Sequence, residues 1–279
     1  MKNKKQIFDS ASIGCSNIIT KSYSTSFTIA IKLLRKEHQN AIYSIYGFVR
    51  LADEIVDSFH DFNKNKLLME LRHETIEALE KKISLNPIIN SFQNTVREYS
   101  IEWPLIDSFL ESMEYDLNHK KCDERSYKKY IEGSAEAVGL MCLQVFSKNN
   151  IGQYQELKPY AISLGSAFQK INFLRDLNED YKILHRVYFP TIDITTFSNN
   201  EKKMIEDDIK KDFANALIGI KLLDIEARSA VYIAYRYYIS LFKKIQRLDA
   251  TDILKKRIRI SNLKKFIILI ISQIKIRFF

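Results

Sequence analysis

The sequence is poor in the residues that break helices. Its 279 residues include only seven glycines and four prolines, about 4% together against roughly 12% in average proteins. Such a low share excludes collagen-like and low-complexity chains. It also argues against turn-dense all-β folds, which need many turn residues. Long helices are expected instead.

Cysteine is scarce as well. Cys15, Cys122 and Cys142 form no close pair in the sequence, and an odd, sparse count favours a reducing compartment over a disulfide framework. The basic start of the chain is not followed by the apolar core of a signal peptide. The most apolar stretch, residues 266–271, is too short to span a bilayer. We therefore expect a cytoplasmic protein, and peripheral contact with the inner face of a membrane is compatible with this pattern.

The net charge of +9 is distributed unevenly. Residues 241–279 contain eleven Lys and Arg but only two Asp, so the rest of the chain is neutral overall. This distribution argues against a nucleic-acid-binding surface. Residues 251–279 are both basic and apolar, and they are predicted to form a C-terminal helix that either closes the fold or rests on an anionic surface.

Apolar residues recur at helical spacing along most of the chain. Helices are expected at residues 22–36, 41–59, 67–83, 88–99, 105–117, 126–146, 155–182 and 251–279, and residues 201–246 should form one long helix or a kinked pair. Residues 185–200 should form an irregular loop, and residues 1–20 an N-terminal segment. The sequence thus predicts one all-α domain over residues 1–279, with about ten helices. Fifteen tyrosines and seventeen phenylalanines are enough to line a large apolar cavity.

Two helical segments each carry an Asp-x-x-x-Asp pair, Asp53 with Asp57 and Asp176 with Asp180. A spacing of four places both carboxylates on one face of a helix. Both pairs are flanked by apolar residues and by an arginine. Two interpretations remain open: binding of a hard divalent cation such as Mg²⁺, or Arg–Asp ion pairs that join helices.

Two further pairs have the same spacing. Asp208 and Asp212 lie among charged residues, and we expect a solvated helix face there. Asp61 follows Asp57 by four residues but should lie beyond the helix end. Neither pair is assigned a function.

The segments around the first two pairs resemble the aspartate motifs of the squalene/phytoene synthase family. Tyr46-x-x-x-Arg50-x-x-Asp53-Glu54-x-x-Asp57 is similar to the first motif. Gln169-x-x-Asn172-x-x-Arg175-Asp176-x-x-Glu179-Asp180, followed by Arg186-Val187-Tyr188-Phe189-Pro190, is similar to the second. The two motifs are in the family's order, about 120 residues apart, a highly specific combination.

Weaker elements extend the resemblance over residues 22–265. They are the Ser- and Phe-containing stretch at 22–27, Met113-x-x-Asp116-Leu117, and the stretch from Tyr130 to Gly139. The chain departs from the family at two points. Glu136 stands where many members have a small residue, and one additional residue separates Asp180 from Arg186.

The resemblance implies a single-domain helical bundle of the isoprenoid synthase type with a central apolar cavity. It also implies a transferase of the prenyltransferase kind, which condenses two geranylgeranyl diphosphate molecules head to head to phytoene through a cyclopropylcarbinyl diphosphate. That reaction is the first committed step of carotenoid biosynthesis. One alternative is a squalene or dehydrosqualene synthase acting on farnesyl diphosphate, with NADPH needed only for squalene. Another is a non-catalytic assembly factor of the same fold.

The resemblance also suggests roles for individual residues. Mg²⁺, or Mn²⁺ in its place, would be bound by Asp53, Asp57, Asn172, Asp176 and Asp180. The substrate diphosphate would be bound by Ser26, Arg50, Gln169, Asn172, Arg175, Arg257, Lys264 and Lys265. The catalytic set would add Tyr46, Tyr130 and Tyr238 to the four aspartates, because aromatic faces stabilise cations. Each tyrosine could equally be a core residue with a satisfied hydroxyl.

Overall fold

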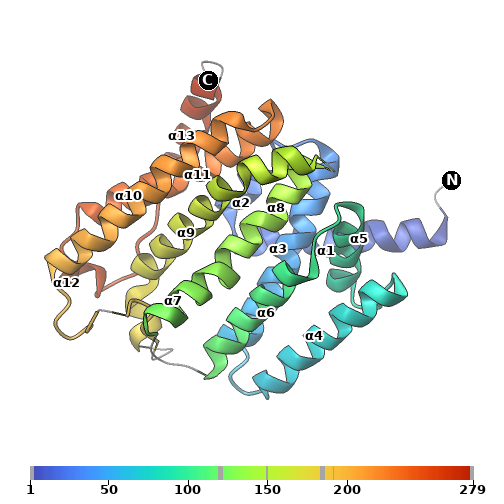
Figure 1. The fold of residues 1–279 in the computed structure, drawn as a ribbon, viewed down its shortest axis with the longest axis horizontal. Coiled ribbons are helices and arrows are strands. Elements are labelled where there is room, and N and C mark those ends of the chain that lie inside the picture. Colours follow the sequence, from blue (N-terminus) through green and yellow to red (C-terminus); the bar gives the residue numbers. More distant parts are fainter. Residues whose placement is uncertain (1–2, 119–121, 149, 183–185, 191, 277–279) are drawn as a thin grey trace.

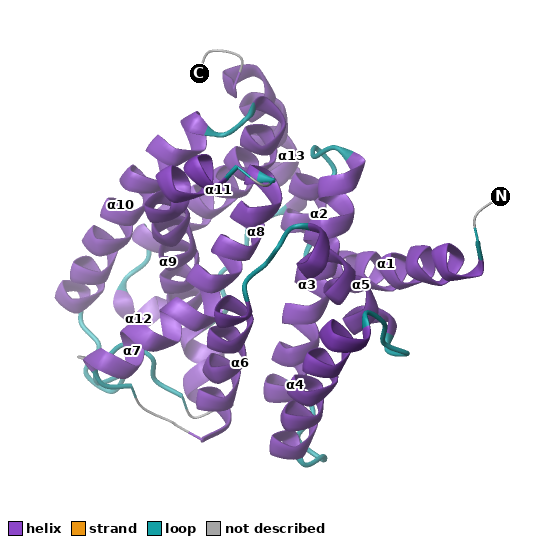
Figure 2. Cartoon of the chain, turned by 45° about the vertical axis from the view of Figure 1, so that its right-hand side comes forward, coloured by secondary structure: helices purple, strands orange, loops and turns teal. Residues whose placement is uncertain are grey.

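The computed structural model describes residues 3–118, 122–148, 150–182, 186–190 and 192–276. Over these residues the chain forms thirteen α-helices and one π-helical turn, and no strand (Figures 1 and 2). The expected all-α class is therefore confirmed. Within the same residues, no helix is both long enough and apolar enough to cross a membrane.

The helices follow one another with short connections. Their bounds are α1 Lys4–Tyr23, α2 Thr25–Ile31, α3 Lys36–Asp57, α4 Lys64–Lys81, α5 Pro87–Glu98, α6 Trp103–Asn118, α7 Glu124–Ile131, the π-helical η1 Glu132–Glu136, α8 Ala137–Ser147, α9 Ile151–Lys182, α10 Asn199–Leu222, α11 Ile225–Gln246, α12 Ala250–Ile253 and α13 Asn262–Lys275. Helices α6, α8, α9 and α10 run side by side in the bundle (Figure 1). The N-terminal end of α1 projects away from it.

Helix α1 occupies residues that we expected to be an N-terminal segment. Its start is stabilised by a capping box between Asn3 and Gln6. Its buried positions are Ser12, Ser16 and Thr20, which pack on α3 and α5. Because this face is small and polar, α1 has no apolar periodicity, and this explains why the sequence pattern missed it.

The segment 201–246, expected as one long helix or a kinked pair, is divided at Leu223 into α10 and α11. Two other expected helices are interrupted, and the first of them, 126–146, contains the π-helical turn η1. The expected C-terminal helix 251–279 is instead α12 and α13, joined by a non-helical segment. That segment places Ile258 in the core with 2% of its surface exposed, and Ser261 accepts a hydrogen bond from the Lys264 backbone to begin α13. The additional residue between Asp180 and Arg186 cannot be located, because residues 183–185 lie outside the described residues.

The small residues of η1 and α8 allow neighbouring helices to approach closely. A Cβ atom added to Gly133 would lie 2.3 Å from the backbone oxygen of Ser108 on α6. One added to Gly165 on α9 would lie 2.8 Å from the backbone oxygen of Ala135. Ser134, Ala135 and Gly139 of the same stretch also line a cavity, so these small residues serve both close packing and the cavity wall.

The close approach at Gly133 makes a stability prediction. Gly133→Ala forces a methyl group against a backbone atom that cannot move aside, so we expect a loss of about 1–3 kcal/mol in the free energy of unfolding. Gly14→Ala is the matched control, because nothing lies within 4 Å of its added Cβ. In α1 the control should raise stability by up to about 1 kcal/mol, since alanine favours helix over glycine. Urea unfolding of both variants measures this, and equal effects would contradict it.

Candidate active site

A cavity of about 390 Å³ lies inside the bundle. Its lining comes mainly from α2, α3, α8, α9, α10 and α11 and is predominantly apolar, including Phe27, Phe168 and Tyr238. The expected central cavity is therefore present. Its polar lining residues include Arg50, Asp53, Gln169 and Asn172. One region of the cavity is thus charged, whereas the rest can accept an apolar chain.

The two aspartate pairs lie close to each other at this polar region. Asp53 and Asp57 end α3, and Asp176 and Asp180 lie in the last two turns of α9. The pKa of Asp180 is raised to about 8 by burial and then by the charges of Asp176 and Asp57. The pKa of Asp53 is raised to about 6 by burial and by Asp57. Asp180 therefore senses carboxylates of both helices, and the four side chains share one electrostatic environment.

Arginines surround the aspartates. Arg50 forms ion pairs with Asp53 and Glu54, and its guanidinium lies 4.1 Å from the centre of the Tyr23 ring. On α9, Arg175 Nε donates to Asp176 at 2.9 Å. Each of these contacts lies within a single helix and so does not join helices, as the ion-pair interpretation from the sequence would require. They leave both arginines beside the carboxylates that would bind a cation.

Arg257 also reaches the second pair. Its Nε lies 2.9 Å from Asp176 Oδ1, and its Nη1 donates to Glu179 at 3.0 Å. This residue comes from the non-helical segment between α12 and α13. The structure thus brings a side chain about 80 residues distant in sequence to the end of α9.

A buried network completes the site and contains residues that we did not assign from the sequence. Asp116 on α6 accepts hydrogen bonds from Tyr130 at 2.6 Å and from Tyr188 at 2.9 Å. Arg186 donates to Asp57 at 2.8 Å and lies 3.8 Å from Asp116. Burial raises the pKa of Asp116 to about 7, although Arg186 lowers it. Arg186 and Asp116 therefore join α3 and α6 behind the first aspartate pair.

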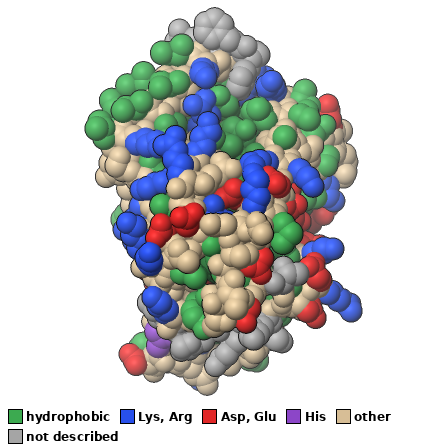
Figure 3. Space-filling model, turned by 90° about the vertical axis from the view of Figure 1, so that its left-hand side faces the viewer, with side chains coloured by type: hydrophobic (Ala, Val, Ile, Leu, Met, Phe, Trp, Pro, Cys, Tyr) green, Lys and Arg blue, Asp and Glu red, His purple; other side chains and the backbone are tan. Residues whose placement is uncertain are grey.

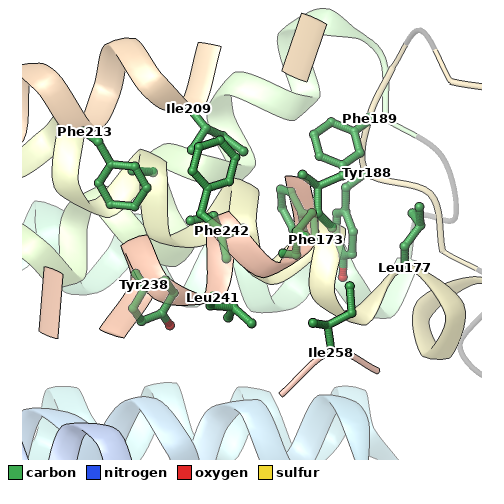
Figure 4. Close-up of a cluster of buried hydrophobic side chains, with 14 of the residues drawn as sticks. Phe173, Leu177, Tyr188, Phe189, Ile209, Phe213, Tyr238, Leu241, Phe242 and Ile258 are labelled. Carbon is green, nitrogen blue, oxygen red and sulfur yellow. The ribbon is translucent and has the colours of Figure 1, made fainter. Parts of the chain in front are cut away.

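Asp116, Arg186 and Tyr188 all lie in or next to sequence motifs that resemble those of the family, although we assigned them no role. Asp116 belongs to the Met113 element, and Arg186 and Tyr188 directly follow the second aspartate motif. Figure 4 shows Tyr188 next to Phe173, with their rings stacked at 4.3 Å between centroids. Only the packing shows that Tyr188 belongs to the site, because an aromatic residue after α9 could as well have been part of the core.

The three tyrosines that we predicted from the sequence all line the cavity. Tyr238 donates to Asn172 at 3.2 Å and stacks on Phe168 at 3.8 Å. Burial raises the pKa of Tyr46 to about 12 and holds that of Tyr130 well above its usual value. All three hydroxyls thus remain protonated and can donate hydrogen bonds.

The remaining residues predicted to bind diphosphate form no hydrogen bond or ion pair with the aspartates in the part of the chain that the structure describes. Lys265 donates to Thr25 at the start of α2. Lys265 and the neighbouring Ser26 therefore lie near the cavity residue Phe27. Lys264 is exposed on α13 and has no ion pair among the described residues. Gln169 accepts a hydrogen bond from Asn172 at 3.3 Å.

Two charged side chains, Glu136 of η1 and Lys170 of α9, face neighbouring helices and do not line the cavity. Glu136 accepts a hydrogen bond from Ser166, so the charge that departs from the family pattern lies between η1 and α9. Lys170 pairs with Asp212 at 2.7 Å and with Asp208. The face of α10 that we expected to be solvated therefore forms part of the α9–α10 contact, because Lys170 is nearly buried there.

The oxygen atoms of the two aspartate pairs and of Asn172 are suitable ligands for a hard cation that is bound jointly by the protein and a phosphate-containing ligand. Among the described residues, no three His, Cys, Asp or Glu side chains form a group that could hold a metal ion by themselves. Two carboxylate pairs, with the amide of Asn172 beside them, offer oxygen donors from facing helices. Mg²⁺ is commonly bound by one or two carboxylates together with phosphate oxygens and water. The raised pKa values of Asp53 and Asp180 also reveal carboxylate repulsion that a cation would relieve.

Comparison with known proteins gives a consistent result. A family model described as squalene/phytoene synthase matches residues 20–264. A 4,4'-diapophytoene synthase of Staphylococcus haemolyticus is 24% identical, covering 88% of this chain and 91% of that protein. A phytoene synthase of Arthrospira platensis is 23% identical, covering 93% and 91%. In fold, the chain is similar to a dehydrosqualene synthase crystallised with a ligand, with a TM-score of 0.82 at 20% identity over 97% of this chain and 98% of that one.

The crowding of carboxylates makes a pH prediction for the metal-free protein. The pKa of Asp180 is about 8 when folded and 3.8 ordinarily. Its contribution to stability is therefore complete below about pH 4 and is lost as the pH rises through about 8. Asp180→Asn mimics the protonated side chain. The loss is progressive between about pH 4 and about pH 8, so we expect the unfolding free energy of the variant to exceed that of the wild type by a small margin at pH 5 and by a much larger one at pH 9, in EDTA.

Asp207→Asn provides the control for this experiment. Asp207 is exposed, and Lys210 lowers its pKa, so it is ionised at both pH values. Its substitution should change stability equally at pH 5 and pH 9. A difference for Asp180→Asn that is also independent of pH would contradict the electrostatic description of the site.

Proposed function

Because the chain belongs to the squalene/phytoene synthase family, we propose that it condenses two geranylgeranyl diphosphate molecules head to head to phytoene. The family consists of prenyltransferase-type enzymes of isoprenoid biosynthesis. The observation that carries the proposal is the position of the two aspartate pairs. They meet at the polar region of an otherwise apolar cavity, where a diphosphate and its isoprenoid chain can be bound together.

The charged region supports departure of the diphosphate. Asp53, Asp57, Asn172, Asp176 and Asp180 would hold Mg²⁺, which neutralises a diphosphate and makes it a better leaving group. The guanidinium groups of Arg50, Arg175 and Arg257 lie at the same carboxylates and can bind phosphate oxygens in a bidentate manner. When a substrate is bound, these arginines would exchange a carboxylate partner for phosphate. Arg186 remains engaged with Asp57 and orients it.

The apolar region supports the carbon chemistry. Loss of diphosphate leaves an allylic cation. Attack by the double bond of the second substrate, followed by loss of a proton, gives a cyclopropylcarbinyl diphosphate. Loss of the second diphosphate, rearrangement of the resulting cation and loss of a second proton then give phytoene. These cations must be protected from water, and the cavity walls exclude it. Phe27, Phe168 and Tyr238 form one aromatic cluster whose ring faces can stabilise positive charge.

Dehydrosqualene formation from farnesyl diphosphate is the second candidate. It is favoured by the similarity to the diapophytoene synthase of S. haemolyticus and by the fold similarity to a dehydrosqualene synthase. We place phytoene first because residues 130–142 resemble carotenoid-pathway members apart from Glu136, and because the phytoene synthase of A. platensis matches 93% of this chain. A non-catalytic role is disfavoured, since all four aspartates and their arginines are present.

A product assay tests the proposal. Purified protein is incubated with Mg²⁺ and either geranylgeranyl or farnesyl diphosphate, with and without NADPH, and the extracted hydrocarbon is identified by chromatography and mass. We expect phytoene from the longer substrate without NADPH. A thirty-carbon product alone would move the protein to the second candidate. Absence of any hydrocarbon from folded protein would overturn both.

The metal assignment predicts the effect of single substitutions. Asp176→Asn removes a carboxylate charge without changing side-chain shape, so we expect turnover to fall by at least about a hundredfold, as when other preorganised electrostatic groups are removed. Asp53→Asn should act in the same way. The matched control is Asp61→Asn, an exposed aspartate beyond the end of α3, which should retain full turnover. Normal activity in either active-site variant would exclude the assignment.

A further inference from the structure

Helix α13 exposes an apolar face that no described residue covers. Six large apolar side chains of this 14-residue helix are between 41% and 71% exposed. They are Leu263, Phe266, Ile267, Ile270, Ile271 and Ile274. Their spacing places them on one continuous stripe of the helix. Such a stripe normally faces the interior of a protein.

The opposite side of α13, which does face the bundle, is partly polar. Ser272 is fully buried, and its Oγ has no hydrogen-bond partner among the described residues. The Nε2 of Gln273 is likewise buried without a partner there. In a helix at a water-exposed surface the polar side chains lie outside and the apolar ones inside. Helix α13 departs from this arrangement, because it exposes six large apolar side chains while Ser272 is buried on its inner side beside Ile268. This indicates that its outer face meets an apolar medium.

Basic residues border the apolar face. By the 3.6-residue period, Lys264 and Lys275 lie at one edge of the stripe. Lys256 and Arg259 are exposed in the segment that precedes the helix, and none of these four has an ion pair among the described residues. Figure 3 shows Lys and Arg side chains in a band below the C-terminal end, with hydrophobic side chains on either side of its upper part. Anionic groups would complement this border.

The inner side of α13 lies on a wall of the cavity. Ile268 belongs to one buried cluster with Ala30 of α2, and with Ile233 and Tyr237 of α11. Ala30 also lines the cavity, as does Ala234 of α11. The exposed stripe is therefore separated from the cavity by one layer of helices.

We propose that α13 lies in the interface of a membrane that contains anionic lipids. A helix of 14 residues is about 21 Å long, too short to span the hydrocarbon core, but it can lie in the plane of the headgroups with its apolar face buried. In that position the six apolar side chains enter the acyl region, and Lys264 and Lys275 contact lipid phosphates. The wall formed by α2 and α11 then faces the membrane.

A second copy of the chain fits this surface less well. A symmetric dimer brings the same patch of each protomer together. The basic border of α13 would then face its own copy, and residues 241–279 carry eleven basic and only two acidic residues. Repulsion between like charges opposes that contact, whereas anionic lipid headgroups attract the same residues.

Vesicle flotation of the full chain tests the membrane interface. Vesicles of phosphatidylcholine alone are compared with vesicles that also contain phosphatidylglycerol. We expect the wild type to float with the anionic vesicles and to be released by high salt, because screening weakens the contribution of the basic border. The double variant Ile267→Gln with Ile270→Gln should reduce the bound fraction at least about tenfold, since burial of the stripe provides the other contribution.

The matched control is Met69→Gln with Ile76→Gln on α4, which removes exposed apolar side chains elsewhere and should float like the wild type. Equal flotation of the α13 variant, or no flotation of the wild type, would overturn the proposal. So would a wild-type dimer in sedimentation velocity that the α13 variant dissociates. Circular dichroism verifies folding.

Membrane binding does not depend on the product of the active site, and the two proposals can fail separately. The α13 variant changes no residue of the cavity, so its turnover in detergent should equal that of the wild type. Flotation without hydrocarbon formation would overturn only the proposed function. Hydrocarbon formation without flotation would overturn only the membrane interface.

Discussion

The concentration of negative charge at the edge of an apolar cavity is the constraint on which this structure depends. Carboxylates that repel one another must be compensated if they are held together away from bulk water. Arginines from separate elements provide this: Arg50 from α3, Arg175 from α9, Arg186 after α9 and Arg257 before α13. Burial, and after it the neighbouring carboxylates, still raise the pKa values of Asp53 and Asp180. A bound cation, as proposed, would stabilise their charged forms.

The cavity itself depends on how closely the surrounding helices approach. Glycines at the crossings of α6, η1 and α9 let backbones come into contact, so the wall is thin but continuous. Larger aromatic side chains then fill the region beside the aspartates. Helix α13 packs directly on the outer side of α2 and α11, which form part of the cavity wall. The charged edge of the cavity, its apolar lining and the exposed stripe of α13 thereby lie within one helical bundle.

Much of the fold and site was predictable because it depends on local pattern. The spacing of Asp53 with Asp57 and of Asp176 with Asp180 placed each pair on one helix face, and the family resemblance placed the facing partners. Helix α1 was missed because its buried face consists of serine and threonine. The single C-terminal helix was wrong because insertion of Ile258 into the core interrupts it. The spacing of apolar residues along the sequence reveals neither the polar buried face of α1 nor the insertion of Ile258.

The sequence by itself determined the helical class, the two carboxylate pairs, and the basic and apolar character of the C-terminus. These follow from composition and from spacing along one helix. Only the tertiary structure decided that Arg257 reaches Asp176, that Tyr130 and Tyr188 share Asp116, and that the apolar stripe of α13 faces outward. Contacts between distant segments depend on which faces pack together, and helical periodicity defines a face without specifying its partner.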